Sequence, residues 1–121
     1  MQILLSTADR LTMQLLLATL TDSGARLDVA ETENEFVRKC LGGAYQLVIT
    51  QFDAPFLNGY DLPDQLRRRR LPRPSFFLLS YVRSEEPLLS FYESGIEQVI
   101  PMPFDADRLR KKVDEKIKSR Q

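Results

Sequence analysis

Histidine is absent from all 121 positions of the sequence. This absence excludes acid–base catalysis by histidine, histidine metal sites and a triad built on serine and histidine, so conventional hydrolytic enzymes are not expected. Cysteine occurs once, as Cys40, and a lone cysteine cannot form a disulfide within the chain. Its neighbours on a predicted helix, Val37 and Leu41, indicate a buried thiol. A reducing compartment, the cytoplasm, is therefore expected.

Long hydrophobic runs and an excess of one charge are also missing. The apolar stretch at residues 3–5 is short and has no basic flank, so neither a signal peptide nor a membrane span is expected. The 17 basic and 17 acidic residues balance, which argues against direct binding of nucleic acid. None of the five glycines lies in the loop after the first apolar run, where a dinucleotide-binding loop requires them.

The remaining composition, with 43% hydrophobic and 28% charged residues, is that of a globular protein and favours one domain over residues 1–121. Short continuous apolar runs predict strands covered on both faces. They lie at residues 3–5, around 27–29, and at 47–49, 76–79 and 99–100. Between and after them, apolar residues recur at helical spacing: Leu11 with Leu15, Leu16 with Leu20, Val37 with Leu41, Leu62 with Leu66, Leu88 with Phe91 and Tyr92, and Leu109 with Val113. The alternation predicts an α/β fold, a doubly wound five-stranded parallel sheet flanked by five helices.

The residues that follow the predicted strands are mostly uncharged. Thr7 and Ala8 follow the first strand, Gln51 the third, Ser80 the fourth and Met102 the fifth. In a doubly wound sheet, ligands bind beyond the C-terminal ends of the strands. These five residues therefore mark the expected functional edge.

Two motifs at this edge resemble a known family. Pro55 and Gly59 lie four and eight residues after Gln51, and the sequence Met-Pro-Phe begins at Met102. The arrangement resembles the receiver domain of response regulators, of the chemotaxis-regulator type, in which proline and glycine follow a phospho-accepting aspartate at these spacings. The resemblance covers nearly the whole chain. It implies a flavodoxin-like three-layer sandwich with strand order 2-1-3-4-5 and a part in two-component signal transduction.

The resemblance assigns a position to each residue at this edge. Gln51 stands at the phospho-acceptor position, and Thr7 and Ala8 stand where the family has two acidic residues that hold Mg²⁺. Ser80 keeps the family's hydroxyl, whereas Met102 replaces its lysine. Three negative groups and one positive group have thus become neutral together, so that no charge is left unpaired. The chain is therefore similar to a degenerate pseudo-receiver.

Three further expectations concern the chemistry of this edge. The amide of Gln51 carries no full charge and cannot form a stable phosphoryl adduct, so phosphorylation of this chain is not expected to drive its part in the phosphorelay signalling that the resemblance implies. The resemblance implies a cis peptide bond before Pro103. It also places Val99 at the family's switch aromatic, and a β-branched side chain cannot swing as a ring does. No metal and no cofactor are expected.

Two groups of charged residues allow other interpretations. Asp9 and Asp53 could hold a divalent cation, but two carboxylates make a weak site, and helix-cap or loop roles are commoner. Asp53 is not the acceptor, because it lies two residues before Pro55 instead of four. The four arginines at residues 67–70 could contact phosphates, although a solvated helix C-terminus is the commoner role.

The leading hypothesis is a binding module that presents its fourth helix, fifth strand and fifth helix to a signalling protein or to its own second copy. Leu88, Leu89 and one neighbouring aromatic are expected in the core, which leaves Tyr92 exposed as a partner anchor.

Basic residues of the last helix are the other predicted partner contacts. Arg110 and Lys111 could pair with Glu97 across a dimer, although a charged face is more often simply solvated.

Two other functions stay open from the sequence alone. The neutral crevice around Thr7, Gln51, Ser80 and Met102 could bind a small ligand, as strand-end crevices of this fold do. Alternatively, the chain is the regulatory domain of a DNA-binding response regulator whose effector domain follows Gln121.

Overall fold

The computed structural model describes residues 1–57 and 59–120. Five parallel strands form one sheet in the order β2-β1-β3-β4-β5, which confirms the predicted topology. The strands are β1 (Gln2–Ser6), β2 (Arg26–Ala30), β3 (Leu47–Thr50), β4 (Ser75–Ser80) and β5 (Gln98–Pro101). The helices are α1 (Arg10–Leu20), α2 (Glu33–Leu41), the 3₁₀ turn η1 (Ala54–Phe56), α3 (Leu62–Arg68), α4 (Glu85–Glu93) and α5 (Ala106–Ser119).

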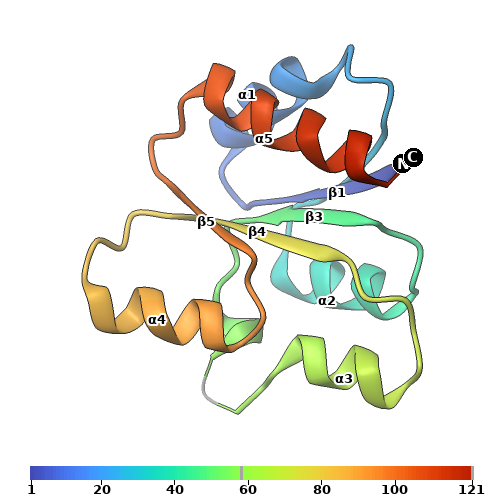
Figure 1. Cartoon of the computed structure of the whole chain (residues 1–121), viewed down its shortest axis with the longest axis vertical. Coiled ribbons are helices and arrows are strands. Elements are labelled where there is room, and N and C mark those ends of the chain that lie inside the picture. The colour runs from blue at the N-terminus through green and yellow to red at the C-terminus, as the bar shows by residue number, and fades with distance from the viewer. Residues whose placement is uncertain (58, 121) are drawn as a thin grey trace.

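The helices form two layers around the sheet. Helices α1 and α5 cover one face, and α2, α3 and α4 cover the other (Figure 1). In the described part of the chain, no helix combines the length and apolar character needed to cross a bilayer.

Both faces of the sheet are covered, which explains why the central strands β1, β3 and β4 carry continuous apolar runs. Along β1, Ile3 and Leu5 join the cluster under α1 and α5, whereas Leu4 joins the cluster under α2, α3 and α4. Side chains of a strand alternate between the two faces, so each strand contributes to both clusters. The lone thiol of Cys40 lies in the second cluster, and burial raises its pKa to about 12.

The predicted burial of Leu89 is wrong, and only one of the two apolar pairs of α1, Leu16 with Leu20, is buried. Leu11 and Leu15 of α1 are 63% and 49% exposed, and Leu89 of α4 is 53% exposed. Helix α1 instead packs through a stripe that includes Met13 and Leu16. Because α1 has apolar residues on more than one side, helical spacing alone could not select the buried stripe.

Helices α3 and α4 end in the same backbone motif. At the end of α4, Gly95 has a φ of 108°, and the N–H of Ile96 donates to the carbonyl of Phe91 at 3.1 Å. At the end of α3, the equivalent residue is Arg70, with a φ of 55°, and the N–H of Leu71 donates back into the helix. This is the Schellman motif, in which glycine normally occupies the left-handed position. Arg70 therefore carries backbone strain that Gly95 does not.

A polar cluster fixes the edge strand β2. The Tyr45 hydroxyl donates to the carboxylate of Asp28, and Lys39 Nζ donates to the same carboxylate at 3.0 Å and to the carbonyl of Val29 at 2.7 Å. The hydrogen bond from Tyr45 is the main reason that the pKa of Asp28 lies below its usual range. The pKa of Tyr45 is raised, first by burial and then by this bond.

Candidate functional site

The backbone of the sheet brings the residues at the strand ends to one edge. The N–H of Thr7 donates to the carbonyl of Ala30 at 3.2 Å, and that of Gln51 donates to the carbonyl of Ser6 at 2.8 Å. The parallel hydrogen-bonding pattern thus continues one residue beyond β1 and β3. Thr7 and Gln51 are held as firmly as strand residues.

Thr7 and Gln51 are bonded to each other. The Thr7 hydroxyl donates to Oε1 of Gln51 at 2.7 Å and accepts from the N–H of Asp9 at 3.1 Å. Thr7 is only 1% exposed, so its hydroxyl is satisfied inside the protein. Ala8, the other residue of this loop that was singled out, is exposed.

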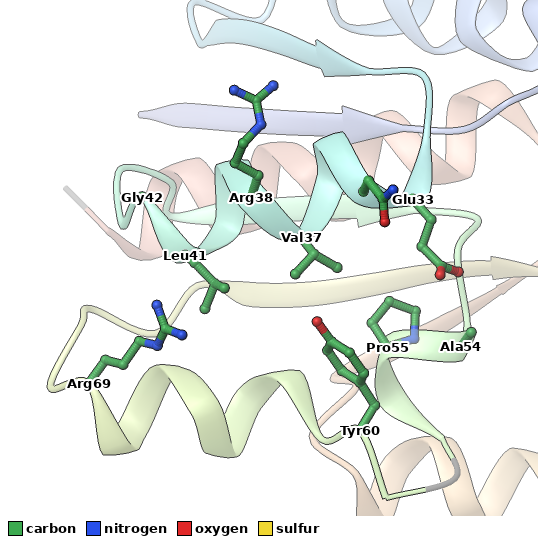
Figure 2. Close-up of a pocket in the computed structure, with 10 residues that line it drawn as sticks. Glu33, Val37, Arg38, Leu41, Gly42, Ala54, Pro55, Tyr60 and Arg69 are labelled. Atoms are coloured by element: carbon green, nitrogen blue, oxygen red, sulfur yellow. The ribbon is translucent and has the colours of Figure 1, made fainter.

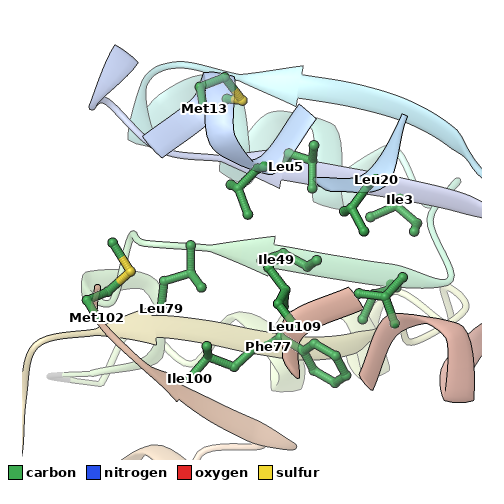
Figure 3. Packing of buried hydrophobic residues seen from close by; sticks show 13 residues of the cluster. Ile3, Leu5, Met13, Leu20, Ile49, Phe77, Leu79, Ile100, Met102 and Leu109 are labelled. Atoms are coloured by element: carbon green, nitrogen blue, oxygen red, sulfur yellow. The ribbon is translucent and has the colours of Figure 1, made fainter. Parts of the chain in front are cut away.

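On the other side of the site, Ser80 and Met102 are buried. The Ser80 hydroxyl accepts from the N–H of Val82 at 3.0 Å. Met102 is 4% exposed and belongs to the hydrophobic cluster under α1 and α5, where Figure 3 shows it beside Leu79. The peptide bond between Met102 and Pro103 is cis, as the sequence motif implied.

Sequence reasoning missed Arg83, which joins two loops at this edge. Its guanidinium donates to the carbonyl of Met102 at 2.7 Å and to that of Ser80 at 3.3 Å. These bonds tie the loop after β4 to the loop after β5. An arginine in a polar loop gives no sequence signal for such contacts, because the two carbonyls lie in separate loops.

The two carboxylates near the edge have different roles. Asp9 caps α1 by accepting from the N–H of Thr12 at 3.2 Å, and the hydrogen bonds from Thr12 lower the pKa of Asp9. Asp53 is exposed and precedes η1 without a side-chain capping bond. Within residues 1–57 and 59–120, no group of three or more Asp, Glu, Cys or His residues could hold a metal ion.

Tyr92 lies where a partner could reach it. It is 48% exposed, whereas its neighbour Phe91 is 2% exposed. The Tyr92 hydroxyl accepts from the N–H of Val99 at 3.3 Å, so the ring rests against β5. Val99 itself is partly buried and packs against the cluster under α2, α3 and α4.

Arg110 of α5 is bonded to the C-terminal end of α1 and to the turn that follows it. Its guanidinium donates to the carbonyl of Thr19 at 3.1 Å and to Asp22, both at the end of α1, and to Asp114 at 2.9 Å. The carboxylates of Asp22 and Asp114 raise the pKa of Arg110. Arg110 thus fastens α5 to α1, and these contacts within the chain already engage its guanidinium.

The predicted pairing of Arg110 with Glu97 across a dimer also loses support, because Glu97 has a partner in its own chain. Lys116 Nζ lies 2.6 Å from Oε1 of Glu97. Lys111 is exposed and is the predicted basic contact that remains.

The fold and this edge together define a doubly wound α/β protein with its candidate site at the C-terminal ends of β1, β3, β4 and β5. The sequence profile of the response regulator receiver domain matches residues 3–114. The chain therefore belongs to the response regulator receiver domain family. No curated protein sequence matches the chain.

Solved structures agree on the fold. A receiver domain of a Francisella response regulator is 22% identical, with a TM-score of 0.81 over 99% of this chain and 98% of that one. A two-component response regulator of Clostridium difficile is 20% identical, with a TM-score of 0.79 over 97% and 95%. A chemotaxis protein of Vibrio cholerae is 18% identical, with a TM-score of 0.75 over 94% and 96%.

Proposed function

We propose that this receiver domain has lost its phospho-acceptor and acts through protein–protein interaction that does not depend on phosphorylation. The observation that carries the proposal is Gln51 at the end of β3, with its amide oxygen accepting from the Thr7 hydroxyl at 2.7 Å. An amide cannot serve as the carboxylate nucleophile of a receiver. As a receiver domain, the chain is a signalling module and not an enzyme, and we place it in the cytoplasm.

The residues of this edge do not fit Mg²⁺. A receiver's metal ion needs carboxylates, because Mg²⁺ gives up its water ligands reluctantly and prefers anionic oxygen. Thr7 and Ala8 offer no negative charge, and Asp9 is engaged in capping α1. Asp53 is one exposed carboxylate, which is too little for a divalent site.

Met102 supports the same proposal from the other side of the edge. A receiver's lysine would bring an ammonium to the phosphoryl oxygens, whereas the Met102 side chain packs into the apolar cluster under α1 and α5. The burial of Thr7, Ser80 and Met102 also gives no support to a small-ligand crevice among them.

The surface that we propose for binding consists of α4, β5 and α5. Leu89 and Tyr92, three residues apart on α4, expose an apolar pair that is 53% and 48% accessible. Exposed aromatic residues are enriched at interface centres. Glu85 and Glu86 in the first turn of α4 are acidic, and Lys111 on α5 is basic, so a second copy could match opposite charges across a two-fold axis.

The first experiment tests the chemistry. The purified protein is incubated with Mg²⁺ and acetyl phosphate, beside an ordinary receiver that labels under the same conditions, and the intact mass is recorded. No phosphoryl adduct is expected. A stoichiometric adduct would contradict the proposal, and mapping the modified residue would identify the true acceptor.

The second experiment tests the surface. Sedimentation velocity over rising concentration is expected to show a dimer that Tyr92→Ala weakens. Leu15→Ala is the matched control, since Leu15 is an equally exposed apolar residue on α1 at 49%, and it should leave association unchanged. Equal effects of the two variants would refute the surface, and a wild-type chain that stays monomeric would refute the second copy as occupant.

A further inference from the structure

A pocket of about 620 Å³ lies between α2 and the segment formed by η1 and α3, away from the strand ends (Figure 2). Val37 and Leu41 line it from α2, and Pro55 and Tyr60 line it from the opposite side. Figure 2 shows these four side chains directed toward one another across the pocket. The volume falls within the range of ligand-binding pockets, and the lining is apolar in the middle.

Tyr60 is available to contact a ligand in this pocket. The residue is 44% exposed, and no hydrogen bond joins its hydroxyl to another described residue. An amphipathic aromatic side chain with an unused hydroxyl offers both contact area and a polar group to a bound molecule.

The two ends of the pocket carry opposite charges. Glu33 stands at the end near Pro55, and Arg69 stands at the end near Leu41 (Figure 2). The ion pairs among the described residues include neither of them. By contrast, the preceding arginines of α3, Arg67 and Arg68, are paired with the carboxylate of Asp64.

Arg69 is therefore the arginine of this run that faces the pocket with its charge available. Arg38 also lines the pocket, but its guanidinium points away from α3 in Figure 2. A guanidinium binds a carboxylate through two parallel hydrogen bonds, which makes Arg69 a suitable end point for a carboxylate.

The distance between the charged ends sets the size of the occupant. On α2 the lining runs from Glu33 to Gly42, and at a rise of 1.5 Å per residue this stretch is about 13 Å long. An extended peptide of about four residues has the same length. A ligand that reaches both charges is thus peptide-sized.

We propose that this pocket between α2 and α3 binds the C-terminal segment of a partner chain. About four extended residues lie along the pocket, with the terminal carboxylate at Arg69, apolar side chains over Val37 and Tyr60, and a basic side chain at Glu33. The proposal is independent of the α4–β5–α5 surface, because it uses none of its residues.

The test uses the acetylated peptide lysine-alanine-leucine-phenylalanine with a free C-terminus and the same peptide as a C-terminal amide. Both are titrated into ¹⁵N-labelled protein. The free acid is expected to shift amide resonances of α2 and of the segment from Ala54 to Arg69. The amide is expected to bind about tenfold more weakly, because a hydrogen bond to a charged group is lost.

Variants separate a specific carboxylate contact from general charge. Arg69→Ala is expected to weaken the free acid by about tenfold and to remove its preference over the amide. Arg70→Ala is the matched control, because it removes the same charge from the neighbouring residue, which does not line the pocket; it should change affinity by less than about twofold. Circular dichroism of each variant verifies its fold.

Three outcomes would overturn the proposal. They are the absence of saturable binding of the free acid up to about 2 mM, equal affinities for acid and amide, and equal effects of Arg69→Ala and Arg70→Ala. None of these results bears on acetyl phosphate labelling or on Tyr92, so failure here is distinguishable from failure of the proposed function.

Discussion

Replacing Met102 with lysine tests whether the former charged site has been repacked as an apolar one. In the wild type, Met102 is 4% exposed among residues such as Leu5, Met13 and Leu79. Lysine has nearly the same length but ends in an ammonium group. The Met102→Lys variant must therefore either bury an unpaired charge or turn the side chain outward and leave a void.

The expected loss in the free energy of unfolding can be worked out for each of these two arrangements of the lysine. An unpaired buried charge costs about 3–5 kcal/mol, and withdrawing a buried methionine costs about 1.5–3 kcal/mol. Because the lysine stem can remain packed while its end reaches solvent, we expect a net loss of about 2–4 kcal/mol in the free energy of unfolding. This is a large share of the roughly 5–15 kcal/mol that stabilises a typical domain.

Urea unfolding followed by circular dichroism measures the loss. With a slope of about 1–3 kcal/mol per molar urea, the midpoint should fall by about 1–2 M. Met102→Leu is the control, since it keeps an apolar side chain of similar volume and should cost less than about 1.5 kcal/mol. If Met102→Lys were no worse than Met102→Leu, the position would be solvated and the repacking argument would fail.

Adding Gln51→Asp to Met102→Lys sharpens the test. The ends of β3 and β5 are two strand spacings apart, about 9.5 Å, a gap that lysine and aspartate side chains can bridge together. The double variant is expected to recover about 1–3 kcal/mol relative to the sum of the single changes. Strict additivity would show that the two positions do not face each other.

The remaining predictions concern helix ends and pH. Arg70→Gly should stabilise the chain by about 0.5–1 kcal/mol by relieving left-handed strain, whereas Gly95→Ala should destabilise it by about 1–2 kcal/mol; thermal melts that shift in the same direction for both would contradict this reading. The lowered pKa of Asp28 gives stability that is present above its unfolded pKa of about 3.9 and lost as the pH falls through the folded value. The raised pKa of Tyr45 gives stability that is present below about pH 10 and lost as the pH rises through the folded value. In a plot of the urea midpoint against pH, Tyr45→Phe should reduce both the loss of stability at low pH and the loss at high pH. Unchanged losses would contradict the coupling between Asp28 and Tyr45.

The sequence was sufficient for the fold because the sheet is covered on both sides. Runs such as residues 47–49 are apolar at every position, a pattern typical of a parallel strand that is buried on both faces, and the helical spacing between the runs supplies the alternation of strands and helices. The edge strand β2 gave the weakest signal, since Leu27 and Val29 are only partly buried there. The face that α1 presents to the sheet could not be predicted, because its apolar residues exceed one stripe and the exposed Leu11 looks like the buried Leu16.

Contacts between segments that are far apart in the chain could not be predicted from the sequence. The strand-end residues could be placed together, because every parallel strand ends at the same edge. The contacts of Arg83 and the pocket next to Tyr60 depend on how loops and helices from different parts of the chain approach one another. Local patterns do not encode those approaches, and the charged run at residues 67–70 gave no sign that Arg69 lines the pocket next to Tyr60.

Arg83 links the strand-end site to the proposed binding surface. Its bonds to the carbonyls of Ser80 and Met102 hold together the loops that lead into α4 and α5. Separating these loops would break a charge-assisted bond of 2.7 Å to a buried residue. Because Gln51 carries no phosphoryl group, no new contact at that position would compensate for the loss of these hydrogen bonds. On the proposed function, the surface of α4, β5 and α5 is therefore held in one arrangement, and its binding is controlled by the concentration of the partner.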